Sequence, residues 1–377
     1  MRTGIRGQGR RTMPDIQPRK KSGEGLKMAA QHEEGVHFSV LHSFPPCELE
    51  VLWRDFLGRV GCPSAYDTPE FFLEPFWEGK HPFAILAFKE GKIFGVLTGL
   101  HLPDRVISGL PSRPQLCITD DNGGIAADTL LKGLLWEAGL ARLIEVFSWH
   151  MTSLPVFEQN GFRKKRLEGD VVLDLRLGAE ALFKQFHENR KRNIRTAMRK
   201  DIEVSEVKTE EDMFAYWGVY CGWRETKRKK VHADNTLAKV KEVHKLVTNH
   251  LRFLARYQGK PIAATSVRFC PGGLIEYASN CSLDEYIGLH PNDLLIWRTI
   301  EWACKRGFQK YSLGAAHPFL RKSGGVVEPI DRYRLDRTFL HRYEAKENLH
   351  AVLRVLFLAL PVQLQQVARA LQKHLAG

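Results

Sequence analysis

The sequence predicts a mixed α/β fold that contains two copies of one unit. In the copy between Leu251 and Gly314, a hairpin of two strand-like runs is followed by a third run, a helix and a last strand. Proline at the start of that helix and glycine just past its end are typical helix boundaries. A helix that leads from one strand to the next in this way is the crossover of an α/β sheet. The same order of elements begins once before, at Phe83.

The two copies are related by a constant separation in the sequence. The runs FAILAFKEGKIFG and LRFLARYQGKPIA begin at Phe83 and Leu251, 168 positions apart (251 − 83). The same separation relates the glycines of the two hairpin turns and the glycines after the two helices: Gly91 and Gly259, and Gly139 and Gly307. A solenoid needs about three or more repeats. We therefore expect a tandem duplication.

The composition is that of a globular protein with a basic surface. The chain has 377 residues, 44% of them hydrophobic and 26% charged, which is enough for two domains with separate cores. Its seven cysteines are odd in number and never spaced as CxxC, so we expect free thiols in a reducing compartment, with neither disulfides nor a zinc site. The net charge of +13 predicts an anionic partner, either nucleic acid, a phosphate-bearing ligand or a membrane surface.

Residues 1–35 form a predicted basic tail. Up to Lys27 the chain carries eight Lys or Arg residues and two acids, is rich in Gly and Pro, and lacks the apolar run of a secretory signal. We expect this segment to be disordered. It is either an arm for nucleic acid or a membrane or, as we prefer, a solvated tail.

The first domain is predicted over residues 36–178. Its strand at Val36 precedes the hairpin, and Thr129–Ala138 is the expected crossover helix before a strand at Leu143–Trp149. A short helix then runs into F-x-x-x-G-F at Phe157–Phe162, and a closing strand follows. A motif of this kind after a strand–helix–strand unit resembles the late part of the GNAT N-acyltransferase fold.

The second domain is predicted over residues 179–345 and opens with a basic helix, Leu182–Lys200. The stretch NRKRNIRTAMRK at the end of this helix is similar to the N-R-x-x-I-R-x-A-x-K pattern of Fem-type aminoacyltransferases, double-GNAT proteins that extend peptidoglycan peptides. The start of the predicted crossover helix, Pro291–Trp297, and a K-x-x-G element at Lys322–Gly325 are similar to the same family. The resemblance extends over about residues 36–345 and is sharper in the second half.

The resemblance implies where the chemistry occurs. In GNAT folds the strands on either side of the crossover helix separate, and the acyl donor enters the gap between them. Backbone amides at such a strand edge can stabilise the oxyanion of the acyl carbonyl, and the acceptor amine is itself the nucleophile, so no Ser-His-Asp set is required. The corresponding gap lies beside the strand end at Tyr311–Gly314 and beside five polar residues: Glu276, Tyr277, Asn280, Asn292 and Asp293. We assign Tyr277, Asn280 and Asn292 to donor binding.

Two donors remain open. GNAT enzymes that use acyl-CoA usually carry a glycine-rich [QR]-x-x-G-x-[GA] loop before the crossover helix, whose amides bind pyrophosphate. Here that position is Tyr286–Asn292, with one glycine. A degenerate loop of this kind is usual in the Fem-type branch, which takes its aminoacyl group from a tRNA. We therefore expect acyl-CoA or aminoacyl-tRNA as a co-substrate, no permanently bound cofactor and no metal.

Three residues near the gap are candidates for the chemistry. Lys322 could hold a phosphate or stabilise a tetrahedral intermediate, or it could be an ordinary loop lysine. His317 could act as a base, although a structural loop histidine is the more common case. Asp293 could also take part, but capping of the crossover helix is the interpretation that we prefer.

The basic helix and a later charged run are candidates for binding phosphates. Arg190, Arg192, Arg195 and Lys200 are expected to face phosphates of the acceptor or of tRNA, because the planar guanidinium group matches phosphate geometry. The alternative is a solvated basic face. Trp223 opens the run WRETKRKK, which combines one aromatic residue with many charges, as an RNA contact does, and which can equally be solvent-exposed.

Residues 346–377 are predicted to form a C-terminal amphipathic helical segment. The run LHAVLRVLFLALPVQL contains one charge, Arg354, but is too short to cross a membrane and is interrupted by Pro361. Attachment to a membrane surface fits a basic amphipathic end. Docking on the domain cores is the alternative.

Together these features predict a cytoplasmic N-acyltransferase, peripheral at the inner face of the membrane, with its site in the second domain. It would form an amide on a primary amine of an anionic cell-envelope precursor, a glycolipid or a peptidoglycan intermediate. The donor would be acyl-CoA or, as in Fem-type enzymes, aminoacyl-tRNA. A protein without catalytic activity that binds an anionic glycolipid or RNA is the alternative from a different class.

Overall fold

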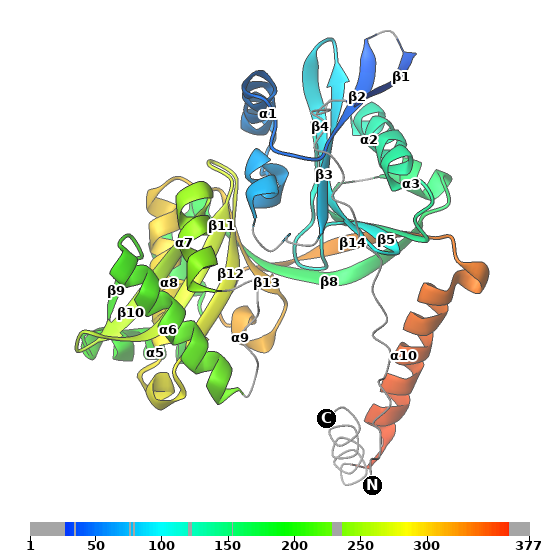
Figure 1. Cartoon of the computed structure of the whole chain (residues 1–377). Helices are drawn as coiled ribbons and strands as arrows, with labels where there is room; N and C mark the ends of the chain where they lie inside the picture. The colour runs from blue at the N-terminus through cyan, green and yellow to red at the C-terminus, as the bar shows by residue number, and fades with distance from the viewer. Residues whose placement is uncertain are drawn as a thin grey trace, which may run out of the picture.

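The computed structural model describes residues 27–33, 35–74, 77, 80–119, 123–152, 154–227 and 236–361. Residues 1–26 of the predicted tail, part of the WRETKRKK run and residues 362–377 lie outside the described residues. Lys27–Glu33, which the sequence predicts to be disordered as part of this tail, instead forms a strand that pairs with the strand at Val36–Leu41. One mixed β-sheet runs through the described molecule, with helices on both faces (Figure 1).

The first half of the chain contains most of one end of this sheet. Its elements, in chain order, are β1 (Lys27–Glu33), β2 (Val36–Leu41), α1 (Cys47–Arg59), the 3-10 helices η1 (Ala65–Asp67) and η2 (Pro69–Leu73), β3 (His81–Lys89), β4 (Lys92–Leu102), β5 (Arg105–Ser108), β6 (Leu116–Ile118), α2 (Gly123–Ala138), β7 (Leu143–Trp149), α3 (Pro155–Gln159) and β8 (Arg163–Asp174).

The second half begins after the 3-10 turn η5 (Leu175–Leu177). Its elements are α4 (Ala179–Gln185), α5 (Glu188–Arg199), β9 (Glu203–Glu206), α6 (Glu210–Thr226), α7 (Leu237–Leu246), β10 (His250–Tyr257), β11 (Lys260–Phe269), β12 (Leu274–Ser282), the 3-10 helix η6 (Asp284–Leu289), α8 (Pro291–Lys305), β13 (Lys310–Ala315), α9 (Pro318–Arg321), β14 (Val326–Asp336), the 3-10 turn η7 (Phe339–His341) and α10 (Arg342–Ala359).

The backbone confirms the duplication. The hairpins β3–β4 and β10–β11 each turn through two residues of positive φ, Glu90–Gly91 at 51° and 75° and Gln258–Gly259 at 51° and 76°. Each hairpin also has a bulge at the equivalent place, at Ala87–Phe88 in the first and Ala255–Arg256 in the second. The crossover helices α2 and α8 are both followed by glycines of positive φ: Gly139 and Gly307. Residues at the same separation therefore have the same conformation.

The two halves exchange strands in the middle of the sheet, whose order is β1-β2-β3-β4-β5-β7-β14-β8-β13-β12-β11-β10-β9. β14, from the end of the chain, lies between β7 and β8, and β8 in turn pairs with β13. Gly169 of β8 lies so close to β14 that a Cβ would be 1.9 Å from the Glu328 carbonyl oxygen. Consequently residues 36–178 and 179–345 share backbone hydrogen bonds, and neither segment completes its sheet alone.

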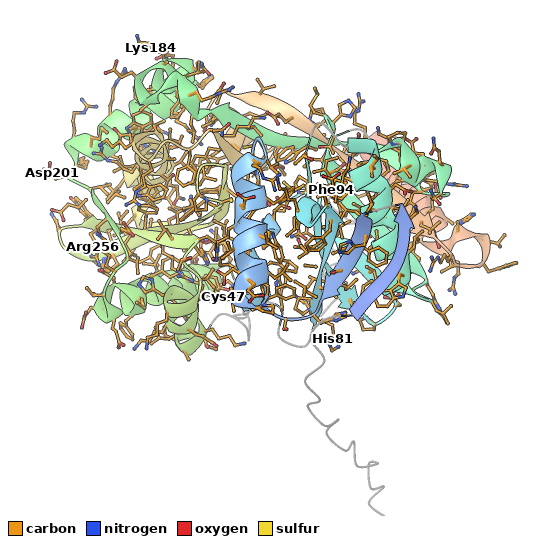
Figure 2. All side chains as sticks on the ribbon, turned by 90° about the horizontal axis from the view of Figure 1, so that it is seen from above. Cys47, His81, Phe94, Lys184, Asp201 and Arg256 are labelled. Carbon is orange, nitrogen blue, oxygen red and sulfur yellow. The ribbon has the colours of Figure 1, made fainter. Side chains whose placement is uncertain are left out.

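Helices cover both faces of each half. In the first half, α2 and α3 pack on one face and α1 on the other. In the second half, α4, α5 and α8 cover one face, and α6 and α7 cover the other. Seen from above, α1 lies between the halves (Figure 2), and its buried Trp53 and Phe56 belong to one core cluster with Cys270, which follows β11. The halves therefore meet through packed apolar side chains as well as through the sheet.

Two predicted helices differ from those observed. The helix predicted over Leu182–Lys200 is broken at Phe186–His187, because His187 Nδ1 accepts a hydrogen bond from the Asn189 amide at 3.2 Å and so caps a new helix, α5. The crossover helix of the first copy begins at Gly123 and not at Thr129.

Three further findings concern the described ranges as a whole. All seven cysteines are unpaired thiols. No group of three His, Cys, Asp or Glu residues in these ranges is arranged to hold a metal ion. No helix in them combines the length and the apolar character needed to cross a bilayer.

Candidate active site

The parallel strands β12 and β13 separate partway along their length. They pair over Leu274–Glu276 and Lys310–Ser312, after which β12 continues beside β11 to Ser282 while β13 continues beside β8. A bulge leaves Ala278 of β12 without a partner on β11 where the strands diverge. The helix α8 begins near this opening with Pro291. This is the place at which the sequence predicts that the acyl donor binds.

In the first copy the corresponding gap is filled by the chain itself. β5 and β7 pair over Arg105–Ser108 and Leu143–Val146, and the segment after β5 then folds back onto the edge of β7. The Gln115 amide donates to the Phe147 carbonyl at 3.2 Å, and Gln115 Oε1 accepts from the Gly109 amide at 3.0 Å. The geometry therefore favours the second copy as the one that holds a donor.

Arg190, which the sequence predicts to contact phosphates, is buried where the helices α5, α8 and α9 meet beside the gap. Its side chain is fully buried, its Nε lies 2.9 Å from Asp293 Oδ1 on α8, and its Nη2 donates to the Phe319 carbonyl on α9 at 2.7 Å. Its Nη1 donates to Ser323 Oγ. Burial lowers the pKa of Arg190, and the carboxylate of Asp293 opposes that effect. Arg190 thus joins α5 to α8 and α9 and is not free to bind a phosphate.

Asp293 belongs to the same junction. Its Oδ1 pairs with Arg190, and its Oδ2 accepts a hydrogen bond from Asn193 Nδ2 on α5 at 2.8 Å. Among the residues that the structure describes, no side chain caps the N-terminus of α8, and Asp293 in particular does not, so the capping interpretation is wrong. With both oxygens engaged, Asp293 holds α8 against α5 and is not free to act as a base.

His317 caps the short helix α9. Its Nδ1 accepts a hydrogen bond from the Phe319 amide at 3.2 Å. A neutral imidazole that accepts at Nδ1 carries its proton on Nε2, so it has no lone pair left for a substrate. This favours the structural interpretation of His317 over the catalytic one.

Lys322 follows α9 and is exposed. Its backbone carbonyl accepts from the His187 amide at 2.9 Å, which joins the end of α9 to the start of α5. Its side chain has no ion pair or hydrogen bond among the described residues. Lys322 therefore remains a candidate for contact with a charged ligand.

Tyr277, Asn280 and Asn292 lie around the opening, two on β12 and one on α8. Asn280 hydrogen-bonds to Tyr277, and Asn292 Nδ2 donates to Ser282 Oγ at 3.0 Å. Burial raises the pKa of Tyr277 well above its usual range, so its hydroxyl keeps its proton. The amide oxygens of Asn280 and Asn292 are buried and have no partner within the described residues. They are available to a donor N–H of a ligand.

Glu276 occupies the last paired position before the gap, opposite Ser312. It is 4% exposed, it accepts a hydrogen bond from the Ala65 amide of the first half, and its Oε2 has no partner in the described part of the chain. Burial raises its pKa, an effect that Arg113 and Arg268 oppose. The sequence analysis located Glu276 beside the gap but assigned it no function.

Asp170 of β8 is a second buried carboxyl at the gap. It is fully buried, and Ser312 Oγ donates to its Oδ2 at 2.8 Å, while Oδ1 has no partner among the residues described. Burial raises the pKa of Asp170 to about 7, and the charge of Glu276 adds to the rise. Sequence reasoning missed Asp170, because it reaches β13 only through the strand exchange. Its single signal in the sequence is a charged residue at the start of the apolar run VVLDL.

Residues of the first half also make polar contacts around Glu276. Arg113 Nη2 donates to the Ala278 carbonyl at 3.3 Å, and its Nη1 donates to the Tyr66 hydroxyl at 3.1 Å. Arg268 Nε lies 2.9 Å from Glu74 Oε2, and both side chains are nearly buried. Both halves therefore form the surroundings of Glu276.

The other predicted basic residues of α5 are spread along the helix. Arg192 and Arg195 are exposed, and the Arg195 guanidinium lies 5.6 Å from the centre of the Phe183 ring. Lys200 caps the opposite end of α5 from the Arg190 junction and lies near the β10–β11 turn. Arg192 and Arg195 remain candidates for phosphate contact near the gap, and Lys200 is separated from them.

Trp223 lies on α6, on the other face of the sheet from α5. It is half-buried, and the Arg224 guanidinium lies 6.0 Å from the centre of its ring. Residues 228–230 of the charged run lie outside the described residues. An RNA contact at Trp223 therefore stays a prediction.

Comparison with known proteins agrees with this architecture. Residues 188–320 match the family described as acetyltransferase (GNAT) domain. The crystal structure of FemX has a TM-score of 0.61 and 11% sequence identity, over 75% of this chain and 95% of that one. The structure of L-PGS from Bacillus licheniformis has a TM-score of 0.52 and 13% identity, over 79% of this chain and 93% of that one. A search of curated protein sequences finds no match.

At such low identities the likeness establishes the fold, which is that of GNAT acyltransferases. The separated strands β12 and β13, the crossover helix α8 and the repetition of the whole unit all agree with it. Residues 188–320 therefore match the GNAT acetyltransferase domain family, and the described chain has a tandem GNAT-like fold similar to that of FemX.

Proposed function

We propose that the protein is an N-acyltransferase that forms an amide on a primary amine of a cell-envelope precursor. The observation that carries this proposal is the open gap between β12 and β13 with two buried carboxyls, Glu276 and Asp170, at its edge. The resemblance of the sequence to Fem-type enzymes supports a cell-envelope acceptor. An exposed set of cations, Lys322, Arg192 and Arg195, supports an anionic one.

In the proposed reaction the acyl carbonyl of the donor lies in the gap. The acceptor amine attacks the carbonyl carbon, the C–N bond forms, and the bond to the leaving sulfur or oxygen breaks. Oε2 of Glu276, which has no partner in the described chain, accepts the proton that the amine loses. Because burial raises its pKa, Glu276 is a stronger base than an exposed carboxylate. The proton held by Glu276 then passes to the leaving sulfur or oxygen, while Tyr277 stays protonated and can donate a hydrogen bond without losing its proton.

Two co-substrates are candidates for this gap, and different observations favour each. The family match of residues 188–320 to an acetyltransferase domain favours acyl-CoA. The segment before α8 favours aminoacyl-tRNA. It consists of the 3-10 helix η6 and of His290 with a φ of 58°, so it lacks the glycine-rich loop that holds the pyrophosphate of CoA.

The test is an assay of amide formation with labelled acetyl-CoA and, separately, with labelled aminoacyl-tRNA, against amine-bearing envelope precursors. Glu276→Gln should lower kcat/KM by about a hundredfold or more, which is the usual contribution of a general base. Glu285→Gln is the matched control, because Glu285 lies on the nearby η6, is exposed and pairs with Lys260. Equal activity of the two variants would reject Glu276 as the base.

A protein that binds an anionic glycolipid or RNA without catalysis is the second candidate function. The exposed cations of α5 and the net charge of +13 favour it as much as they favour an enzyme. Binding of either ligand without amide formation from either donor would establish this alternative and reject the acyltransferase.

A further inference from the structure

The last described helix, α10, leaves the body of the protein and carries an apolar surface. Figure 1 shows it projecting away from the sheet. None of its residues is buried. Six of its large apolar side chains are between 52% and 67% exposed: Leu349, Val352, Leu353, Val355, Leu356 and Leu358. An apolar surface of this kind on a helix with a fixed position requires a partner.

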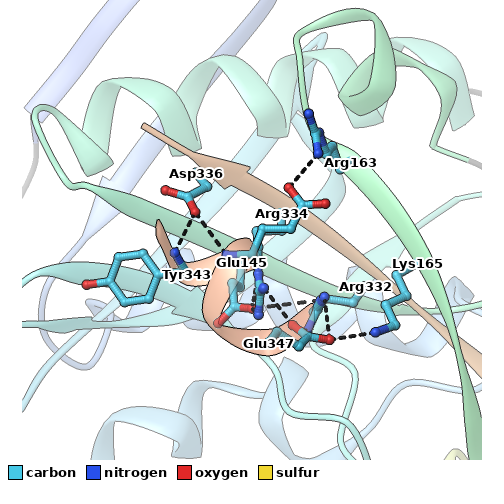
Figure 3. A network of polar contacts seen from close by, with 9 residues as sticks. Glu145, Arg163, Lys165, Arg332, Arg334, Asp336, Tyr343 and Glu347 are labelled. Carbon is cyan, nitrogen blue, oxygen red and sulfur yellow. Dashed lines mark hydrogen bonds and ion pairs between the residues drawn. The ribbon is translucent and has the colours of Figure 1, made fainter. Parts of the chain in front are cut away.

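The first two turns of α10 are held firmly by the sheet (Figure 3). Arg334 Nη1 donates to Glu347 Oε2 at 2.6 Å, and Lys165 Nζ lies 2.6 Å from Glu347 Oε1. Glu344 pairs with Arg163 at 2.7 Å. Although burial opposes it, the hydrogen bond from Arg332 and the neighbouring cations hold the pKa of Glu347 at about 2, so the network persists at any ordinary pH. The direction of α10 is therefore set by the body.

These contacts also determine which side of α10 faces outward. Arg342, Lys346, Leu349, Leu353 and Leu356 follow one another at i, i+4, i+7, i+11 and i+14, so they form one line along the helix. Glu344 and Glu347 lie on the opposite side, where they contact the sheet. The line thus begins with two cations near the body and continues with apolar side chains away from it. We call these five residues the α10 stripe.

A hollow of about 360 Å³ lies at the cationic end of the α10 stripe. It is lined by Arg142, Thr338, Arg342, Tyr343 and Lys346. The side chains of Arg142, Arg342 and Lys346 have no ion pair within the described chain. Two acids contact lining residues: Asp104 accepts a hydrogen bond from the Tyr343 hydroxyl, and Asp336 accepts hydrogen bonds from the Thr338 hydroxyl and the Tyr343 amide. Three unpaired cations around a hollow favour an anionic group there.

We infer that α10 is a membrane-docking helix, which lays the α10 stripe on a bilayer that contains anionic lipids. The apolar side chains enter the boundary between headgroups and acyl chains, and the hollow with Arg142, Arg342 and Lys346 receives a lipid phosphate. The helix lies on the bilayer and does not cross it.

Two other partners could cover the α10 stripe: a second copy of this chain and residues 362–377 of the same chain. Charge complementarity favours an anionic bilayer over both. If two copies of the α10 stripe packed side by side in parallel, the cations of one would face the cations of the other. In an antiparallel arrangement the cations of each copy would face the leucines of the other. The α10 stripe contains no acid that could pair with them. Residues 362–377 also contain no Asp or Glu, and they include Arg369, Lys373 and His374, so folding them back onto α10 would bring cation to cation. Anionic headgroups supply the missing charge.

The experiment is co-sedimentation of the full-length protein with vesicles of phosphatidylcholine alone and of phosphatidylcholine with phosphatidylglycerol. Wild type should bind the anionic vesicles more tightly, and less so as salt is added. Leu353→Asp with Leu356→Asp should weaken binding to both vesicle types at least about tenfold. Arg342→Ala with Lys346→Ala should weaken binding roughly tenfold, and to the anionic vesicles alone.

Phe214→Asp is the matched control, because Phe214 is an apolar residue of α6 that is 61% exposed and distant from α10 in the sequence. It should leave vesicle binding unchanged. Failure of wild type to bind either kind of vesicle would overturn the proposal, and so would equal loss of binding in Phe214→Asp.

Light scattering on the same proteins provides a further check. A wild-type dimer that becomes a monomer in the Leu353→Asp, Leu356→Asp variant would assign the α10 stripe to a second copy instead. None of these measurements depends on the acyltransferase activity.

Discussion

Replacement of Arg190 by methionine would remove the charge that joins α5, α8 and α9 while keeping much of the side-chain volume. The change leaves three acceptors without their donor: the buried Asp293 Oδ1 and Ser323 Oγ and the part-buried Phe319 carbonyl. An unpaired buried acceptor costs about 1–3 kcal/mol, and removal of one partner of a buried ion pair costs about 3–5 kcal/mol. Because the contacts are neighbours their costs do not add, and we expect a loss of about 4 kcal/mol in the free energy of unfolding.

Urea unfolding followed by tryptophan fluorescence measures this loss. For a chain of this length, about 4 kcal/mol corresponds to a fall in Tm of roughly 5 °C. Arg192→Met is the matched control, because Arg192 lies on the same helix but is exposed, so its free energy of unfolding should change by less than about 0.5 kcal/mol. Arg190→Met with Asp293→Leu removes both charges and should recover part of the loss.

The result that would refute the reasoning is equal stability of Arg190→Met and Arg192→Met. In that case the buried pairing with Asp293 does not form in solution. A further rise in KM for Arg190→Met at unchanged stability would return Arg190 to the phosphate-binding role that the sequence predicted for it.

Three further predictions concern the acceptor site, the pH dependence and the strand exchange. Arg192→Ala and Arg195→Ala should raise KM for an anionic substrate and flatten its salt dependence while leaving kcat mostly unchanged; a loss of kcat at constant KM would contradict this. Asp170 has a pKa of about 7 in the folded protein against 3.8 as the ordinary value, so its contribution to stability is complete below pH 3.8 and is lost as the pH rises through 7. Asp170→Asn should therefore gain stability relative to wild type at pH 8 but not at pH 4, as thermal unfolding at the two pH values would measure. Residues 36–178 and 179–361, expressed apart, should not fold, because β8 and β14 each lose two neighbouring strands, and mixing them should restore the circular dichroism of the whole chain. A native spectrum of either segment alone would count against the exchange.

The sequence predicted part of the candidate site and missed the rest. Tyr277, Asn280 and Asn292 could be placed at the gap because the family resemblance puts the gap beside the crossover helix, which two of them precede and in whose first turn Asn292 lies. The basic stretch of α5 could be recognised, but its arginines cover most sides of the helix, so the pattern did not indicate that Arg190 turns inward to Asp293. Asp170 could not be found, because Ser312, the residue that bonds to it, is 142 positions away in the sequence.

The sequence by itself determined the local structure and its repetition. Hairpin turns at Gly91 and Gly259, helix ends at Gly139 and Gly307, and the constant separation between the copies depend on backbone preferences that adjacent residues express. Only the tertiary structure decided three features: β14 is inserted between β7 and β8, Gln115 pairs with β7 in the gap of the first copy, and two buried carboxyls, Glu276 and Asp170, lie at the gap of the second. The physical reason is that hydrogen bonds between strands join backbone groups that every residue has, so the choice of neighbouring strand depends on how the whole sheet packs.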